Sequence, residues 1–133
     1  MRTSFIAAIA MSLGISPMMA SADTSPIVRK PLLTAPIDGG KTIQRVEVKE
    51  IEFSARQQTG LHLHPCPVVG YIVEGSVTFQ VEGQGVQTLR AGDAFYEPAN
   101  TKILRFDANE DKVKFVAYYL LGKEDNELIK MLP

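Results

Sequence analysis

The chain has 133 residues, of which 45% are hydrophobic and 22% are charged. This composition is typical of a single globular domain and excludes a chain that is disordered throughout. Lysine and arginine together number 14 against 15 acidic residues, which gives a formal net charge of −1. A nucleic-acid-binding surface needs a basic excess to neutralise phosphates, so the charge balance argues against that class of partner. The single cysteine excludes a disulfide within the chain.

The first 22 residues have the features of a secretory signal peptide. Arg2 gives a positive start, residues 5–15 form an apolar run, and residues 20–22 fit the small-x-small cleavage pattern. The apolar run is too short to span a bilayer comfortably, and no other segment is as apolar over the length of a membrane helix. We therefore expect cleavage after Ala22, export to the periplasm or to the outside of the cell, and a mature protein without a membrane span.

The mature chain begins with a proline-rich segment and continues as short β-type runs. Residues 23–36 contain three prolines, which cannot donate to a ladder, so this segment is predicted to be an extended arm. Beyond it, runs rich in β-branched and aromatic residues are separated by glycine and proline turns. The predicted strands are 42–55, 61–64, 68–73, 77–82, 86–89, 94–97, 102–106 and 112–121.

The end of the chain has a different pattern. Residues 125–132 show helical spacing, with Leu128, Ile129 and Leu132 on one face, and predict a short C-terminal helix. The many short strands without alternating helices predict one all-β domain over residues 37–133, either a sandwich or a barrel.

Two histidines, the only ones in the chain, are the strongest chemical signal. His62 and His64 lie two residues apart on a predicted strand. Side chains at i and i+2 of a strand point to the same face, about 6–7 Å apart at the backbone, so both imidazoles can bind one metal ion. Cys66 has the same parity and lies between two prolines that can hold its thiol near the histidines. Its alternative interpretation is a small buried hydrophobic residue.

Three further side chains are candidates for binding a ligand. Glu97, beside a proline at a strand end, is a candidate third metal ligand or acid–base group, or else a solvated carboxylate at the rim. Arg105 can point into a barrel and hold a carboxylate ligand. Tyr71 belongs to a set of aromatic residues at strand spacing, which either line a pocket or form the core. No nucleophile elbow, P-loop or dinucleotide motif is present.

Between residues 60 and 106 the sequence resembles the cupin superfamily. Residues 62–75, HLHPCPVVGYIVEG, are similar to the first cupin motif, and residues 92–100, GDAFYEPAN, are similar to the start of the second. A predicted hairpin separates the two, as in cupins. The resemblance is greatest to small exported cupins of the quercetin-dioxygenase-like type. It implies a conserved barrel, the double-stranded β-helix or jelly roll, and a homodimer joined through the outer sheet and the N-terminal arm.

Five positions depart from these motifs, and one of them is Asp107, on which the second-motif asparagine of the family falls. The metal-binding glutamate of the family falls on Val68 and its second-motif histidine falls on Ile103. Two of the four usual metal ligands are therefore apolar here. The motif glycines fall on Arg56 and Asn100.

Two imidazoles alone seldom bind a metal ion tightly, so three alternatives stay open. Cys66, Glu97 or another side chain replaces the lost ligands. Alternatively, the metal site is degenerate and leaves a pocket for a small molecule. Finally, His62 and His64 act without a metal, as a proton-transfer or pH-responsive pair.

These observations predict an exported small cupin that binds a metal ion, a small molecule or both through His62 and His64. Zn, Fe, Mn, Ni and Cu are all candidate metals for such a site. The alternative function is a metal-dependent enzyme of the dioxygenase or isomerase type, which acts on a small phenolic or carbonyl compound. In that case Cys66 or Glu97 would complete the set of metal ligands.

Overall fold

The computed structural model describes residues 21–22 and 25–133, and this part of the chain contains strands and no helix. Each predicted strand is present, with small changes at its ends. The strands are β1 (Arg45–Phe53), β2 (His62–Leu63), β3 (Val68–Glu74), β4 (Ser76–Val81), β5 (Gln87–Arg90), β6 (Ala94–Glu97), β7 (Lys102–Ala108), β8 (Val113–Leu121) and β9 (Lys130–Met131).

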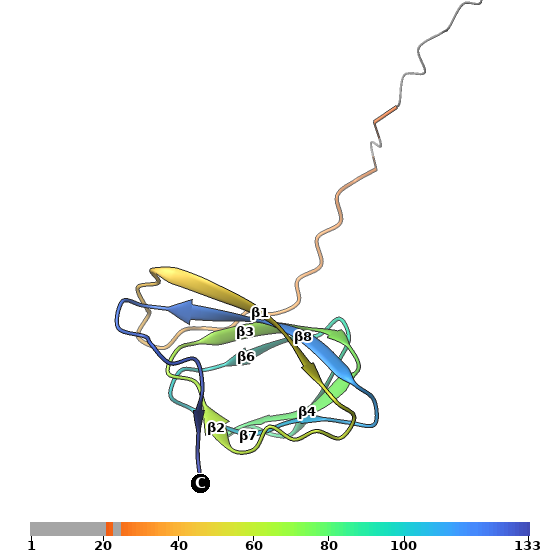
Figure 1. Ribbon diagram of the computed structural model, residues 1–133. Helices are drawn as coiled ribbons and strands as arrows, with labels where there is room; N and C mark the ends of the chain where they lie inside the picture. The colour runs from red at the N-terminus through yellow and green to blue at the C-terminus, as the bar shows by residue number, and fades with distance from the viewer. Residues whose placement is uncertain (1–20, 23–24) are drawn as a thin grey trace, which may run out of the picture.

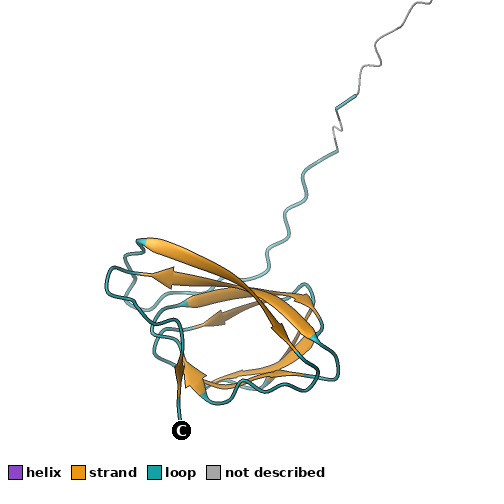
Figure 2. Ribbon diagram, in the orientation of Figure 1, coloured by secondary structure: helices purple, strands orange, loops and turns teal. Residues whose placement is uncertain are grey.

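The strands form two antiparallel sheets that lie face to face (Figures 1 and 2). One has the order β1-β8-β3-β6 and the other the order β5-β4-β7-β2-β9. The prediction of an all-β domain with two antiparallel sheets is confirmed. Closure of the two sheets into a barrel stays a prediction.

The core lies between the sheets and follows the period of two that a strand imposes. In β8, buried residues alternate with more exposed ones from Val113 to Leu121. Phenylalanine rings join the two sheets: the ring centroids of Phe95 and Phe106 lie 5.0 Å apart, and those of Phe106 and Phe115 lie 4.9 Å apart. Gly70 permits this packing, because a Cβ at its position would lie 2.0 Å from the ring of Phe95.

The C-terminal segment corrects one prediction, because residues 125–132 do not form a helix. Instead β9 pairs with β2, and the backbone NH of Leu132 donates to the carbonyl of Leu61 at 2.9 Å. The helical spacing misled because a segment this short has little helical stability of its own. The free edge of β2 instead provides hydrogen-bond partners for the backbone of the C-terminal segment.

Two loop positions explain how the chain tolerates the loss of the motif glycines. Arg56 and Asn100 have φ angles of 61° and 55°, in the left-handed region that favours glycine. The backbone NH of Asn100 donates to the carbonyl of His64 at 2.7 Å. The backbone at these positions therefore keeps a glycine-like conformation, and the turn after β6 is tied to the histidine segment.

The N-terminal predictions fall mostly outside the described residues. The predicted signal peptide, residues 1–22, is described only at residues 21 and 22. Residues 25–36 of the predicted arm contain no helix or strand. Within the described residues, no helix is long and apolar enough to cross a membrane. Export stays a prediction.

Candidate metal centre

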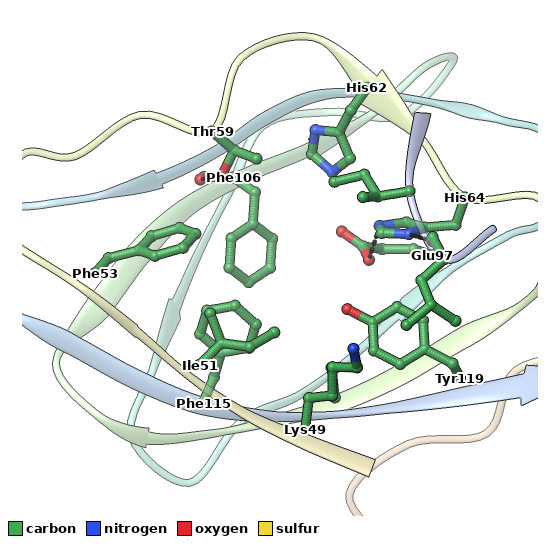
Figure 3. Close-up of a pocket in the computed structure, with 13 residues that line it drawn as sticks. Lys49, Ile51, Phe53, Thr59, His62, His64, Glu97, Phe106, Phe115 and Tyr119 are labelled. Atoms are coloured by element: carbon green, nitrogen blue, oxygen red, sulfur yellow. Dashed lines mark hydrogen bonds and ion pairs between the residues drawn. The ribbon is translucent and has the colours of Figure 1, made fainter. Parts of the chain in front are cut away.

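Three buried polar side chains meet at one place between the sheets. His62 and His64 come from β2 and the residue that follows it, and Glu97 ends β6. The three residues are at most 4% exposed, and their potential ligand atoms lie within 4.8 Å of one another. Figure 3 shows the two imidazoles and the carboxylate turned toward one another. The predicted histidine pair and Glu97 are therefore brought together.

The strand register explains how Glu97 reaches the histidines. Glu97 on β6 lies directly opposite Val68 on β3, the position at which the usual metal-binding glutamate is missing. Directly paired residues project to the same face of a sheet. The carboxylate is therefore supplied from the neighbouring strand. Ile103, which stands at the position of the second-motif histidine, is paired with His62 and provides no ligand atom.

Each imidazole is oriented by a backbone carbonyl. The Nδ1 of His62 lies 2.8 Å from the carbonyl oxygen of Gly60, and the Nδ1 of His64 lies 2.5 Å from that of Leu128. A carbonyl oxygen can only accept a hydrogen bond, so both Nδ1 atoms carry hydrogen. The Nε2 atom of each neutral ring is then left with a free lone pair. Such backbone support of the distal ring nitrogen is typical of metal-binding histidines.

The contact between His64 and Glu97 requires either a proton or a metal ion between the two groups. The Nε2 of His64 lies 3.0 Å from Oε2 of Glu97. Because Nδ1 of His64 already holds one hydrogen, a neutral ring would bring two acceptors together at this distance. Burial alone lowers the pKa of His64, but the hydrogen bond and the negative charge of Glu97 outweigh it, so its pKa is raised. Either a proton or a metal ion can satisfy this pair.

A pocket of about 310 Å³ adjoins the three residues. Its walls are mostly apolar, and its polar groups are few. Burial, assisted by the charge of Glu97, raises the pKa of Tyr119 to about 12, so the phenol stays neutral at physiological pH. The pocket is lined by Lys49, Ile51, Phe53, Thr59, His62, His64, Glu97, Phe106, Phe115, Ala117, Tyr119, Leu128 and Ile129.

Three other predicted site residues lie elsewhere. Cys66 is 0% exposed in the connection from β2 to β3, outside the group of three ligands, and burial raises the pKa of its thiol. Tyr71 is on the outer face of β3, next to the inward-facing Gly70. Arg105 is exposed and pairs with Asp107 at 3.0 Å.

A strand irregularity accounts for the position of Arg105. The pairing of β4 with β7 shifts in register, so that Gln80 faces Arg105 whereas the next residue, Val81, faces Ile103. A bulge adds a residue to one strand and reverses the alternation beyond it. Ile103 and Arg105 are therefore not on the same face, although they are two residues apart.

No motif in the sequence singled out the polar Lys49 and Thr59, or the apolar Ile51, Phe53, Phe106, Ala117, Leu128 and Ile129, as pocket residues. A signal for Lys49 was present, because it shares the parity of the inward-facing Ile51 on β1. Thr59 and the C-terminal pair had no comparable signal. Their positions depend on how loops fold over the sheets.

Comparison with known proteins supports the same fold. A DMSP lyase from Ruegeria pomeroyi DSS-3 superposes with a TM-score of 0.58 at 16% identity, over 65% of this chain and 42% of the lyase. An oxalate oxidase in complex with the substrate analogue glycolate gives 0.57 at 19% identity, over 66% and 46% of the two chains. A cupin-like protein from Thermotoga maritima superposes with a TM-score of 0.56 at 18% identity, over 65% of this chain and 64% of that protein.

At these identities the structural likeness establishes the fold and nothing of the activity. The chain spans less than half the length of the lyase and of the oxidase. No curated protein matches the sequence. Residues 49–118, more than half of the chain, match the family described as Cupin domain. With this match, the histidine pair and the two-sheet fold in agreement, the chain belongs to the cupin family.

Proposed function

We propose that this protein is an exported cupin in which His62, His64 and Glu97 hold a divalent transition metal ion beside a pocket for a small molecule. The observation that carries the proposal is the group of three buried donors, whose potential ligand atoms lie within 4.8 Å of one another. The metal part stands on this geometry. Export to the periplasm or the cell exterior is supported by the N-terminal sequence alone.

The three side chains fit a metal ion of the first transition row or Zn²⁺. Two imidazoles and one carboxylate form a common donor set for Zn²⁺ and for non-haem Fe(II), and they also suit Mn²⁺ and Ni²⁺. Cys66 lies outside the group, so no thiolate is available to favour Cu(I). With three protein ligands, a bound ion would keep open positions and would act there as a Lewis acid toward a ligand oxygen.

A homodimer is part of the same proposal. The outer face of the β1-β8-β3-β6 sheet carries exposed Val48, Tyr118 and Tyr71, which supports association through this face. Light scattering and sedimentation of the mature protein test it. A monomer at tens of micromolar protein would contradict it.

A metal-dependent enzyme is the second candidate, and one observation favours it. The three-ligand group adjoins a pocket large enough for a small organic molecule, as catalytic metal sites do. The oxalate oxidase that shares the fold binds a substrate analogue in its solved structure. A dioxygenase or isomerase acting on a small phenolic or carbonyl compound fits such a site. Oxygen consumption and product analysis with the metal-loaded protein test this alternative.

Metal binding is tested directly on untagged mature protein, because a polyhistidine tag would itself bind metal. The protein is stripped with a chelator, equilibrated with each candidate ion, dialysed and assayed by elemental analysis. We expect about one ion per chain for at least one metal. Loss of a ligand in His62→Ala or Glu97→Gln should weaken its affinity at least about tenfold.

Cys66→Ser is the matched control. A thiol is a common metal ligand, and Cys66 is buried, but it lies outside the group of three. The variant should keep the wild-type affinity for the metal. Absence of metal uptake by the wild type, or equal affinity in Glu97→Gln, would refute the metal site. Loss of metal in Cys66→Ser would instead add the thiol to the ligands.

A further inference from the structure

One cation lies among the apolar residues that face the pocket from β1. The inward positions of this strand include Lys49, Ile51 and Phe53, which all line the pocket. Lys49 is directly opposite Ala117 on β8, and the small side chain of Ala117 leaves room for the lysine chain to extend over the pocket. Figure 3 shows the amino group of Lys49 directed toward the pocket, on the same side as the Tyr119 hydroxyl.

The amino group of Lys49 has no ion pair with any residue that the structure describes. Glu47, the acidic residue two positions away on the same face, is paired with Arg45 at 3.5 Å. Lys114 behaves differently, because on the outer face of the sheet it pairs with Glu50 and Glu52. Of these three cations, Arg45 and Lys114 have carboxylate partners, whereas Lys49, which is directed to the pocket, has none among the described residues.

Tyr119 supplies a second polar group with free capacity. It is paired with Glu47 in the register, which makes it a diagonal neighbour of Lys49 on the same face of the sheet. Diagonal neighbours are about 7–8 Å apart at the backbone, within reach of long side chains. No hydrogen bond joins the Tyr119 hydroxyl to a described residue. The ammonium group of Lys49 and the neutral phenol of Tyr119 can thus both donate hydrogen bonds to the same acceptor group of a ligand.

We propose that the pocket binds small organic acids, with the ligand carboxylate held by Lys49 and Tyr119 and its hydrocarbon part against the phenylalanine wall. Lys49 is exposed, so a ligand carboxylate can reach its amino group, and hydrogen bonds between charged groups are the stronger ones. Phe53, Phe106 and Phe115 provide flat apolar surface for an aryl or alkyl group. This inference rests on the proposed function only in that the ligand occupies the same pocket.

The test uses pairs of ligands that differ in charge and share a shape. Benzoate is compared with benzamide, and hexanoate with hexanamide, by isothermal titration and by chemical-shift changes in NMR spectra of the mature protein. Each pair is measured on metal-stripped and on metal-loaded protein. We expect the acids to bind more tightly than the amides in both forms. Lys49→Met should weaken binding of the acids about tenfold or more and binding of the amides much less, so that the preference for the acids is lost.

Two variants control for the charge and for its position. Lys49→Arg keeps a cation at the pocket and should retain the preference for the acids. Lys114→Met removes a cation from the outer face of the same sheet and should change nothing. Thermal unfolding and metal content are recorded for every variant, because both should remain at wild-type values in Lys49→Met.

The outcomes separate the two proposals. Acid binding that needs the metal and is unaffected by Lys49→Met would overturn the role of Lys49 while leaving the metal site intact. Acid binding by stripped protein that depends on Lys49 supports the inference even where no metal is taken up. Equal affinity for acids and amides, or no binding of the acids at all, would overturn the inference.

Discussion

The interior between the two sheets contains two groups of aromatic rings that are held in different ways. Phenylalanines form one group, in which Phe79, Phe95, Phe106 and Phe115 contact one another at centroid distances of 4.9 to 6.0 Å. The second group contains His62, His64 and Tyr119, with centroids 5.2 and 5.8 Å apart. The distances are similar, but the first group is fixed by packing alone, whereas the two imidazoles of the second are also held by hydrogen bonds to backbone carbonyls.

This difference separates stability from chemistry in the fold. Rings without polar atoms lose nothing when water is excluded, so the phenylalanines contribute through buried area and edge contacts. Imidazoles are costly to bury unless their nitrogens have partners. The carbonyls of Gly60 and Leu128 satisfy one nitrogen of each ring and leave the other directed to Glu97 or to the pocket. Changes in the two groups should therefore have separable effects.

The largest expected effect is the loss of a phenylalanine. Phe95 is buried, contacts three other phenylalanine rings and does not line the pocket. Phe95→Ala removes a buried ring and leaves a cavity, so it should lower the free energy of unfolding by about 3–5 kcal/mol. Urea unfolding measures this loss. In the absence of urea, the folded variant should keep the wild-type affinity for metal.

A double-mutant cycle with Gly70 sharpens the measurement. Gly70→Ala places a Cβ where the Phe95 ring lies, so alone it should destabilise the protein by about 1–3 kcal/mol. In the Phe95→Ala background the ring is gone, and the same change should cost clearly less. Additive losses would show that the two positions do not contact each other. Weakened metal binding in Phe95→Ala would show that the two groups of rings are not separable.

The next effect concerns the strand from which the carboxylate comes. Glu97 and Val68 are directly paired across β6 and β3. If position and not identity matters, Val68→Glu should restore metal binding in the Glu97→Gln background, with a gain of about tenfold over Glu97→Gln alone. Equilibrium dialysis with the metal that the wild type prefers measures the gain. Val68→Gln in the same background is the control, because it has the shape without the charge.

Failure of the rescue has a definite meaning when the double variant is folded. It would show that only the position of Glu97 reaches the Nε2 atoms. Equal rescue by Val68→Gln would show that the carboxylate charge is not what binds the ion. Either result would contradict the interpretation that the carboxylate has changed strands within one metal site.

The sequence predicted the strands and the histidine pair because both depend on short-range periodicity. His62 and His64 are on one face in any register, as are the buried positions of β8. The contribution of Glu97 depends on the pairing of β3 with β6, which the periodicity of one strand does not determine. Arg105 could point inward by its position in the sequence, but a bulge in β7 turns it outward. Non-local pairing therefore decides where both Glu97 and Arg105 point.

The C-terminal segment shows the same limit. Residues 125–132 have helical spacing, but the partners of this segment decide its conformation. β9 pairs with β2, and Leu128 accepts the hydrogen bond of His64 through its carbonyl. A short segment thus becomes part of the metal centre through contacts with residues some 60 positions earlier in the chain. Lys49 could have been found, since extending the alternation of Ile51 and Phe53 by one step reaches it.

The smallest expected effect is a pH dependence confined to the polar group of rings. In metal-free protein the folded pKa of His64 is raised above its unfolded value of about 6.5, although burial opposes the charge, because Glu97 stabilises the imidazolium. The stabilisation of the folded protein by the His64–Glu97 pair is therefore complete below the unfolded pKa of His64. It is lost as the pH rises through the folded pKa. Glu97→Gln removes it.

Urea unfolding in the presence of a chelator should then show a larger difference between wild type and Glu97→Gln at pH 6 than at pH 9. Phe95→Ala should shift the free energy of unfolding equally at both pH values, because the rings that Phe95 contacts are phenylalanines, which do not titrate. A difference for Glu97→Gln that is the same at both pH values would contradict the protonated pair. Since a metal ion must displace this proton, the metal affinity of the wild type should rise over the same pH range.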